Sequence, residues 1–297
     1  MFLSLFSKKS PKLDAIELLG NAPGKTLLIT AGMDGDEYVG IAAAHEIARR
    51  FSARPFSGKL ILIPIVNMPG FMNESSHNPI DGKFPKMLFP GNANGSSTEQ
   101  IVASLAPHAF ATDCWLDLHS GAMTEGLNPF LWFHRTGKAD VDVQIERFVS
   151  ANIADRVLIE SCPMGTKAAQ LAKRGCMYVV AESGARGNRD GIDLERHIRW
   201  AEAMMSLLGM IDTPIAQIAT PIVVMNQIRY VVAPHDGIWD PSVFATETIK
   251  KNDVIGIARS IKGGKPKTIA APVAGYRLWW KETMRMKKGD VLCAIGF

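Results

Sequence analysis

The sequence has few of the features that mark secreted or membrane-spanning proteins. Its four cysteines form no Cys-x-x-Cys pair, and most lie in or beside an apolar stretch, so we expect buried free thiols in a reducing compartment. No stretch approaches the roughly 18–20 apolar residues of a membrane span. The apolar run at the N-terminus is too short for a signal peptide. We therefore expect a cytoplasmic protein without a membrane partner.

Charge of one sign is also scarce. The 33 basic and 29 acidic side chains leave a net charge of +4, which is too small and too dispersed to indicate nucleic-acid binding. Apolar residues make up 47% of the chain, as in ordinary globular proteins, so global disorder is not expected. The 297 residues are enough for one large domain, or for a domain with a smaller companion.

Apolar runs alternate with helix-like patterns through the first two-thirds of the chain. We predict strands at 26–31, 59–66, 114–119, 129–134 and 176–182, and helices at 37–51, 96–106, 141–154, 167–175 and 193–211. Between them lies a long stretch rich in Gly, Pro, Asn and Ser, residues 67–98, and loops of that length are usually functional. The alternation predicts an α/β domain, residues 1–215, in which helices flank a mainly parallel mixed sheet.

From about residue 215 the pattern changes to short Val/Ile runs separated by turns. Two related segments are visible, "VVAPHDGIW…IKKNDVIGIA" and "IAAPVAGYRLWW…MKKGDVLCAIG". An internal repeat of this kind indicates two similar β-hairpin units packed together. We predict a small all-β domain, 216–297, that resembles a barrel or sandwich and has two related halves.

Ionisable residues follow three of the predicted strands. Asp34, Asp36 and Glu37 come after the first, His119 ends the third, and Glu182 ends the strand that begins at Cys176. Ligands of open parallel sheets bind beyond the carboxyl ends of the strands. Carboxylates there are costly unless they are paired or bound to a cation. Their shared position therefore predicts a functional site.

This set of side chains suits a hydrolytic zinc site. Such a site uses three protein ligands and leaves a fourth position for water. Asp34 and Glu37 are three residues apart across a turn, so both can converge on one ion, and His119 would supply the nitrogen ligand. Zinc lowers the pKa of its water to about 7. Glu182 would then act as general base and afterwards as general acid toward the leaving amine.

Each residue also has a simpler explanation when taken alone. The two aspartates of the first cluster can form an Asx turn and cap the following helix. His119 can be a satisfied core histidine, and Glu182 can pair with Arg186 or Arg189. These alternatives stay open, but the common place of the residues at strand ends favours the metal site.

Several motifs together resemble the succinylglutamate desuccinylase/aspartoacylase family. They are "AGMDGDEYVG", "LDLHSG", "VVAESG", Asn67 with Pro69, "DGKFPKMLFPG" and the two-repeat β-domain. The resemblance covers nearly the whole chain, in order. It implies a zinc carboxypeptidase-like fold, one zinc ion (Zn2+) per chain, and hydrolysis of the amide bond of a small-molecule substrate, an N-acyl amino acid or related N-acyl amine. A non-hydrolytic metal- or ligand-binding relative, or an esterase on the same scaffold, is the alternative.

The chain departs from the family pattern at its charged positions. Asp34 stands where the family has its first histidine ligand, which makes Mn2+ or another divalent metal more competitive. Lys86 and Met87 replace the family's Asn-Arg pair, which holds a substrate carboxylate, and Ser76 stands at the position of an earlier arginine. The anion-binding arginines implied by the family are therefore missing.

Other residues could take over substrate binding. We single out His77 as a donor to the oxyanion, Lys83 and Lys86 as positive charges, and Arg186 and Arg189 at the mouth of the site. A lysine cannot reproduce the bidentate grip of an arginine on a carboxylate. Ordinary solvated loop charge is the alternative for both lysines. Nothing in the sequence sets the oligomeric state, and a homo-oligomer remains open.

Overall fold

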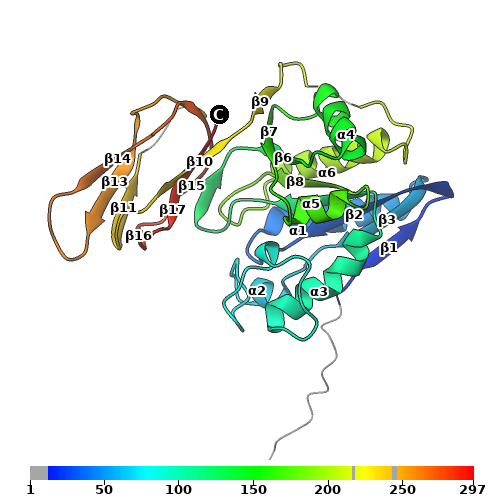
Figure 1. The fold of residues 1–297 in the computed structure, drawn as a ribbon, viewed down its shortest axis with the longest axis horizontal. Helices are drawn as coiled ribbons and strands as arrows, with labels where there is room; N and C mark the ends of the chain where they lie inside the picture. The colour runs from blue at the N-terminus through cyan, green and yellow to red at the C-terminus, as the bar shows by residue number, and fades with distance from the viewer. Residues whose placement is uncertain (1–12, 216–217, 243–245) are drawn as a thin grey trace, which may run out of the picture.

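The computed structural model describes residues 13–215, 218–242 and 246–297. An eight-stranded sheet forms its centre, in the order β1-β3-β2-β4-β8-β6-β7-β9 (Figure 1). Its strands are β1 (Ile16–Leu19), β2 (Ala22–Ala31), β3 (Ser57–Ile63), β4 (Cys114–His119), β6 (Phe130–Arg135), β7 (Arg156–Ser161), β8 (Met177–Glu182) and β9 (Val223–Met225). All neighbouring pairs are parallel except β1·β3 and β6·β8. The predicted mainly parallel mixed sheet is confirmed.

Helices cover both faces of this sheet. On one face the apolar cluster includes residues of α1 (Tyr38–Phe51), α4 (Ala139–Ser150) and α6 (Gly191–Leu207). On the other face it includes residues of α3 (Ser97–Phe110) and α5 (Lys167–Ala172). The short α2 (Met68–Met72) and the 3-10 helix η1 (Pro85–Met87) lie in the long loop. Within the described residues, no helix is both long and apolar enough to cross a membrane.

The local signals behave as their chemistry predicts. Val39, Ala43, Ile47 and Phe51 of α1 are all buried, as their four-residue spacing requires. The predicted capping box at the start of α3 is also present, because Ser96 and Glu99 exchange side-chain and backbone hydrogen bonds.

Three strands of the large sheet lie outside those predicted for the α/β domain: β1, β7 and β9, the last of which falls within the predicted β-domain. β7 has only three consecutive apolar residues between Arg156 and Glu160, and β1 is a four-residue edge strand with alternating exposure. Runs this short give little periodicity. β7 is stabilised as a strand by pairing with both β6 and β9, which its local sequence does not indicate.

Two smaller antiparallel sheets follow. One contains β10 (Ile228–Val232), β17 (Val291–Gly296), β15 (Gly275–Lys281) and β12 (Thr248–Ile249), and β5 (Glu125–Leu127) adds to it through β15; the other contains β14 (Lys267–Ala270), β13 (Val254–Ser260), β11 (Gly237–Pro241) and β16 (Arg285–Met286). The two repeat segments form the antiparallel pairs β11·β13 and β15·β17.

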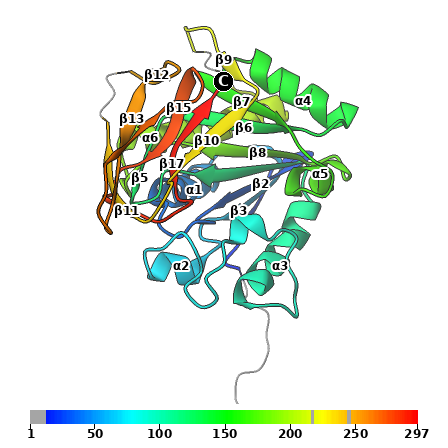
Figure 2. The ribbon, with the colours of Figure 1, turned by 60° about the vertical axis from the view of Figure 1, so that its left-hand side comes forward.

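The small sheets are tied to the β6–β7–β9 side of the large sheet (Figures 1 and 2). Phe130 and Leu158 of the large sheet share an apolar cluster with Leu278 and Ala294 of the small one. Strand pairing also crosses the predicted domain boundary after residue 215, because β9 pairs with β7 and β5 pairs with β15. Strands from both parts thus surround the space between them.

Candidate metal and catalytic site

Sheet order brings the predicted site residues together. β2, β4 and β8 are consecutive neighbours, and His119 of β4 lies opposite Glu182 of β8 in the register. Asp34 and Glu37 follow β2 after a turn at Gly32, whose φ of +61° is readily adopted by glycine. The parallel strands therefore deliver all four side chains to one edge of the sheet.

Three of these side chains form a compact buried cluster. The potential ligand atoms of Asp34, Glu37 and His119 all lie within 4.8 Å of one another. His119 Nδ1 lies 2.8 Å from Glu37 Oε2, which also accepts a hydrogen bond from the Ser120 backbone N–H at 3.0 Å. Burial opposes protonation of His119, but Glu37 and Asp117 raise the pKa of its ring well above the usual value. In the absence of an ion the two carboxylates favour the protonated ring, and a divalent ion bound here would take the place of that proton.

Asp34 completes the donor set. Its Oδ2 accepts a hydrogen bond from Lys86 Nζ, while its buried Oδ1 has no hydrogen-bond partner among the described residues. Burial raises the pKa of the Asp34 carboxyl to about 6, even though Lys86 lowers it. An unbonded buried carboxylate oxygen beside a second carboxylate and an imidazole is the donor set that zinc or manganese binds. The residues present therefore fit a divalent metal.

A second layer holds His119 through Asp117, two residues earlier on the same face of β4. Asp117 accepts hydrogen bonds from Thr30 Oγ1 at 2.6 Å and from the Tyr178 hydroxyl at 2.8 Å. Its Oδ2 lies 3.4 Å from His119 Nε2 and 3.7 Å from Lys167 Nζ. Sequence reasoning missed Lys167 and Tyr178, which come from separate elements, and it gave Asp117 no role; the Asp-x-His spacing is the signal that could have found that role.

Glu182 lies half-buried beside this cluster. Burial raises the pKa of its carboxyl to about 8, with His119 lowering it and Glu37 raising it further. Among the described residues it has no ion pair, because the expected alternative partner, Arg186, binds Glu282 instead. A carboxyl whose pKa lies near neutrality is suited to proton transfer in both directions.

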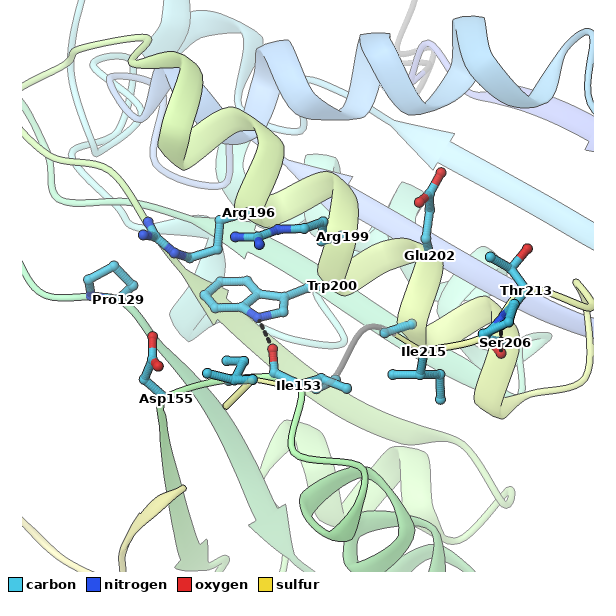
Figure 3. Close-up of a pocket in the computed structure, with 14 residues that line it drawn as sticks. Pro129, Ile153, Asp155, Arg196, Arg199, Trp200, Glu202, Ser206, Thr213 and Ile215 are labelled. Atoms are coloured by element: carbon cyan, nitrogen blue, oxygen red, sulfur yellow. Dashed lines mark hydrogen bonds between the residues drawn. The ribbon is translucent and has the colours of Figure 1, made fainter. Parts of the chain in front are cut away.

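These residues open onto one large cavity. Its volume is about 1040 Å³, and it is lined by Glu37, His119 and Glu182 on one side and by Tyr230, Trp279 and Lys281 of the small sheet region on the other. A second cavity, of about 210 Å³, lies between α6 and the segments near Ile153 and Thr213 (Figure 3). None of the candidate residues lines it, nor do any line a third cavity of about 760 Å³ beside β1.

Only one of the predicted substrate-binding residues reaches that cavity. Lys86 lines it, and its ammonium is held by Asp34 in the field of Glu37 and Glu182. Burial opposes the charge of Lys86, but the Asp34 and Glu37 carboxylates raise its pKa above the usual value. Lys86 is therefore a half-buried cation paired with a buried carboxylate, and the alternative of a solvated loop charge does not apply to it.

The other predicted substrate-binding residues are not among the described residues that line the cavity, namely His77, Lys83, Arg186 and Arg189. His77 is exposed and its Nδ1 lies 2.9 Å from Ser75 Oγ. Lys83 Nζ donates to Glu99 of α3 at 3.0 Å. Arg186 is exposed and faces a carboxylate of the small sheet region. These contacts fix loops around the site.

Asp36 anchors the long loop instead of capping α1. The first turn of that helix has no side-chain cap, since its N-cap residue is Glu37. Asp36 accepts a hydrogen bond from Ser76 Oγ at 2.7 Å. A Cβ on neighbouring Gly35 would come within 2.2 Å of the Gly70 carbonyl carbon, so only glycine allows the loop to approach this closely. The loop is thereby packed against the acidic cluster.

Known proteins resemble this chain in sequence and in architecture. A curated relative, the N-alpha-acetyl-L-2,4-diaminobutyric acid deacetylase of Halomonas elongata, is 25% identical over 249 residues, which cover 81% of this chain and 72% of the relative. Among solved structures, a succinylglutamate desuccinylase from a Silicibacter species has a TM-score of 0.80 at 22% identity, covering 96% of this chain and 88% of that one.

A further structural relative is the product-bound ectoine utilization protein of Ruegeria pomeroyi, with a TM-score of 0.82 at 23% identity, covering 95% of this chain and 88% of that one. These likenesses establish the fold. Residues 23–208 also match the model of the succinylglutamate desuccinylase/aspartoacylase catalytic domain. That match spans more than half of the chain and includes all four strand-end residues of the candidate site. The chain therefore belongs to the succinylglutamate desuccinylase/aspartoacylase family, whose named members are amide hydrolases.

Proposed function

We propose that the protein is a metal-dependent deacylase that cleaves the amide bond of a small N-acyl amino acid or a related N-acyl amine. The observation that carries this proposal is the convergence of Asp34, Glu37 and His119, with ligand atoms within 4.8 Å, beside a cavity that Glu37, His119 and Glu182 line. The family's amide-hydrolase members support the reaction type.

The residues divide the work by their chemistry. Asp34, Glu37 and His119 would hold one divalent ion, zinc or manganese. A bound ion of this kind polarises the scissile carbonyl and makes a water molecule more acidic. Glu182 takes a proton from the attacking water and returns it to the departing nitrogen, a role that suits its raised pKa. Asp117 keeps the His119 ring in place.

Lys86 has a separate role. Its ammonium lines the cavity beside the cluster, where it can stabilise negative charge that develops on the carbonyl oxygen. It stands at the position where the family pattern has an Asn-Arg pair, and it cannot form a bidentate contact with a carboxylate. We infer that the preferred substrate differs from those of family members that grip an anionic acyl group.

The Halomonas relative is named for a substrate with an N-acetyl group and a second amine, and N-acetylated amino acids are accordingly the first compounds to test. A screen of N-acyl amino acids and N-acyl amines, with zinc and with manganese, tests the proposal directly. Matched esters in the same screen identify an esterase. A protein that binds metal but cleaves no amide or ester would be the non-hydrolytic relative. We further propose that the enzyme works in the cytoplasm, because its cysteines are free and mostly buried. Size-exclusion chromatography with light scattering tests whether it forms a homo-oligomer.

A further inference from the structure

The far side of the large cavity carries an acidic group with aromatic neighbours. Glu160 of β7 lines the cavity together with Trp132 of β6, Tyr230 of β10 and Trp279 of β15. We call these four side chains the aromatic–acid subsite. They come from both the large and the small sheets, so the subsite exists only where the two parts of the fold meet.

The three rings form a continuous wall. The Trp279 ring centroid lies 6.4 Å from that of Trp132 and 5.7 Å from that of Tyr230. None of the three side chains is fully buried, and Tyr230 is 44% exposed. Aromatic rings that face a cavity attract cations through their negative faces, and tryptophan does so best.

Glu160 supplies a negative charge at this wall. Burial raises the pKa of its carboxyl, and the Trp132 indole lowers it. Among the described residues Glu160 has no ion pair. The charge of Glu160 in turn helps burial to raise the pKa of Tyr230 to about 12. In the β6·β7 register Glu160 lies opposite His134, which is two residues from Trp132 and on the same face of β6.

The cations of the cavity are already engaged elsewhere. Lys86 contacts Asp34, Lys167 Nζ lies 3.7 Å from Asp117, and Lys281 Nζ lies 3.5 Å from Asp290. Glu160 is thus a half-buried carboxylate in a cavity lining that also includes the three aromatic rings, and no lysine of the described cavity wall neutralises it. A half-buried carboxylate is stabilised by a cation that enters the cavity.

The subsite lies within reach of the reaction centre. The charges of Glu160 and Glu182 both act on Tyr230, as does that of Lys86. Tyr230 lines the same cavity as Glu182 and Glu160. A substrate whose amide lies at Glu182 can extend past this ring toward the carboxylate.

We propose that Glu160, Trp132, Tyr230 and Trp279 bind a positively charged amino group on the substrate, so that the preferred substrates are N-acyl compounds with a second, cationic amine. The inference rests on the proposed deacylase function for its catalytic meaning. The binding of a cation at this subsite is separable from hydrolysis, and it can be measured without turnover.

The kinetic test uses two substrates that differ only in the charged group. Nα-acetyl-lysine ends in an ammonium, whereas N-acetylnorleucine ends in a methyl group. We expect wild-type kcat/KM to favour Nα-acetyl-lysine by at least about tenfold, and Glu160→Gln to remove most of this preference. Asp290→Asn removes a negative charge from another wall of the same cavity and should preserve the preference.

The binding test uses butylammonium, with butyrate as the anionic reference, in a ligand-observed NMR titration. We expect butylammonium to bind wild type and Asp290→Asn, and to bind Glu160→Gln at least about tenfold more weakly. Trp279→Phe should weaken binding less than Trp279→Leu, since phenylalanine keeps a ring and leucine does not.

The two tests separate the two proposals. Hydrolysis with no cation preference, or with a preference that Glu160→Gln leaves intact, overturns the subsite and leaves the deacylase standing. Glu160-dependent butylammonium binding without hydrolysis of any N-acyl compound supports the subsite and overturns the deacylase. Equal binding of butylammonium by wild type and Glu160→Gln overturns the subsite in either case.

Discussion

The carboxylates at the two ends of the large cavity differ in whether a neighbouring cation compensates their charge. At the cluster end, Asp34 and Glu37 are buried, and their charge is matched by Lys86 and His119 within contact distance. At the other end, Glu160 is half-buried and has aromatic neighbours without an ion pair among the described residues. The first end carries its own cations, whereas the second is ready to accept one from outside.

This difference bears on what each end does. Compensated buried charges are held rigidly, which suits side chains that must bind a metal and move a proton. An uncompensated carboxylate at an accessible wall contributes little to the empty protein and more when a cation arrives. We therefore propose that the cluster end carries out the chemistry and that the Glu160 end selects the substrate.

The largest effect should come from changing the base at the cluster end. Glu182→Gln keeps the shape of the side chain but cannot accept a proton, so we expect kcat to fall by roughly 10²–10⁴-fold while the metal content stays the same. Steady-state kinetics and metal analysis of the same sample check this. Asp290→Asn is the matched control, because it also changes a carboxylate to an amide in the same cavity and should leave kcat near wild type. Full activity of Glu182→Gln would contradict its role.

A second effect concerns the support behind Glu182. His197 of α6 is buried, its Nε2 lies 3.0 Å from the Ser183 carbonyl oxygen, and burial lowers the pKa of its ring to about 4. Between pH 6.5 and about 4 the unfolded chain binds a proton at this histidine that the folded chain does not. The free energy of unfolding should therefore decrease as the pH is lowered from 6.5 to about 4, by about 3 kcal/mol in all.

Urea unfolding at several pH values measures this loss. His197→Gln should remove most of this contribution, whereas His45→Gln, at an exposed position, should leave the pH dependence as in wild type. A His197→Gln protein with the wild-type pH dependence would show that the acid sensitivity comes from other groups.

The compensation at the cluster end can itself be broken. Lys86→Met removes the ammonium that contacts Asp34, and a divalent ion then no longer has to compete with it for that carboxylate. We expect zinc to bind roughly tenfold more tightly, as the loss of one nearby positive charge implies. Competition with a chromophoric chelator measures the affinity, and Lys83→Met, whose ammonium pairs with Glu99, is the control. Weaker metal binding by Lys86→Met would mean that Lys86 organises the site and does not oppose the ion.

The smallest effect is expected outside both ends. Arg186 is 56% exposed at its side chain, pairs with Glu282 and does not belong to the described cavity lining. Arg186→Ala should change kcat/KM by less than about threefold and stability by about 1 kcal/mol at most. Kinetics on the substrate found in the screen, with thermal unfolding, checks both. A loss of a hundredfold in kcat/KM would place Arg186 at the bound substrate.

The sequence predicted the elements whose signals are local. The strand that ends at His119, the helix after Glu37 and the capping box at Ser96 follow from apolar spacing and side-chain chemistry within a few residues. β7 escaped prediction because its apolar run is short and its stability comes from neighbours distant in sequence. The same limit kept β5 hidden, since it joins a strand some 150 residues later.

The candidate site followed the same rule. Strand ends located Asp34, Glu37, His119 and Glu182, because parallel neighbours place their carboxyl ends together. Which charged loop residue would enter the cavity depended on tertiary packing, and Lys86 did so while Lys83 turned to α3. Glu160 gave no signal, because the rings around it come from β6, β10 and β15.

The metal content of the purified protein tests the central claim most directly. We expect about one equivalent of zinc or manganese per chain in wild type and less than about a tenth in Asp34→Ala, with circular dichroism showing the same fold in both. Removal of the metal by a chelator should abolish hydrolysis, and adding it back should restore it. A metal-free wild type that still hydrolyses N-acyl amino acids, or an Asp34→Ala protein with a full equivalent of metal, would contradict the account.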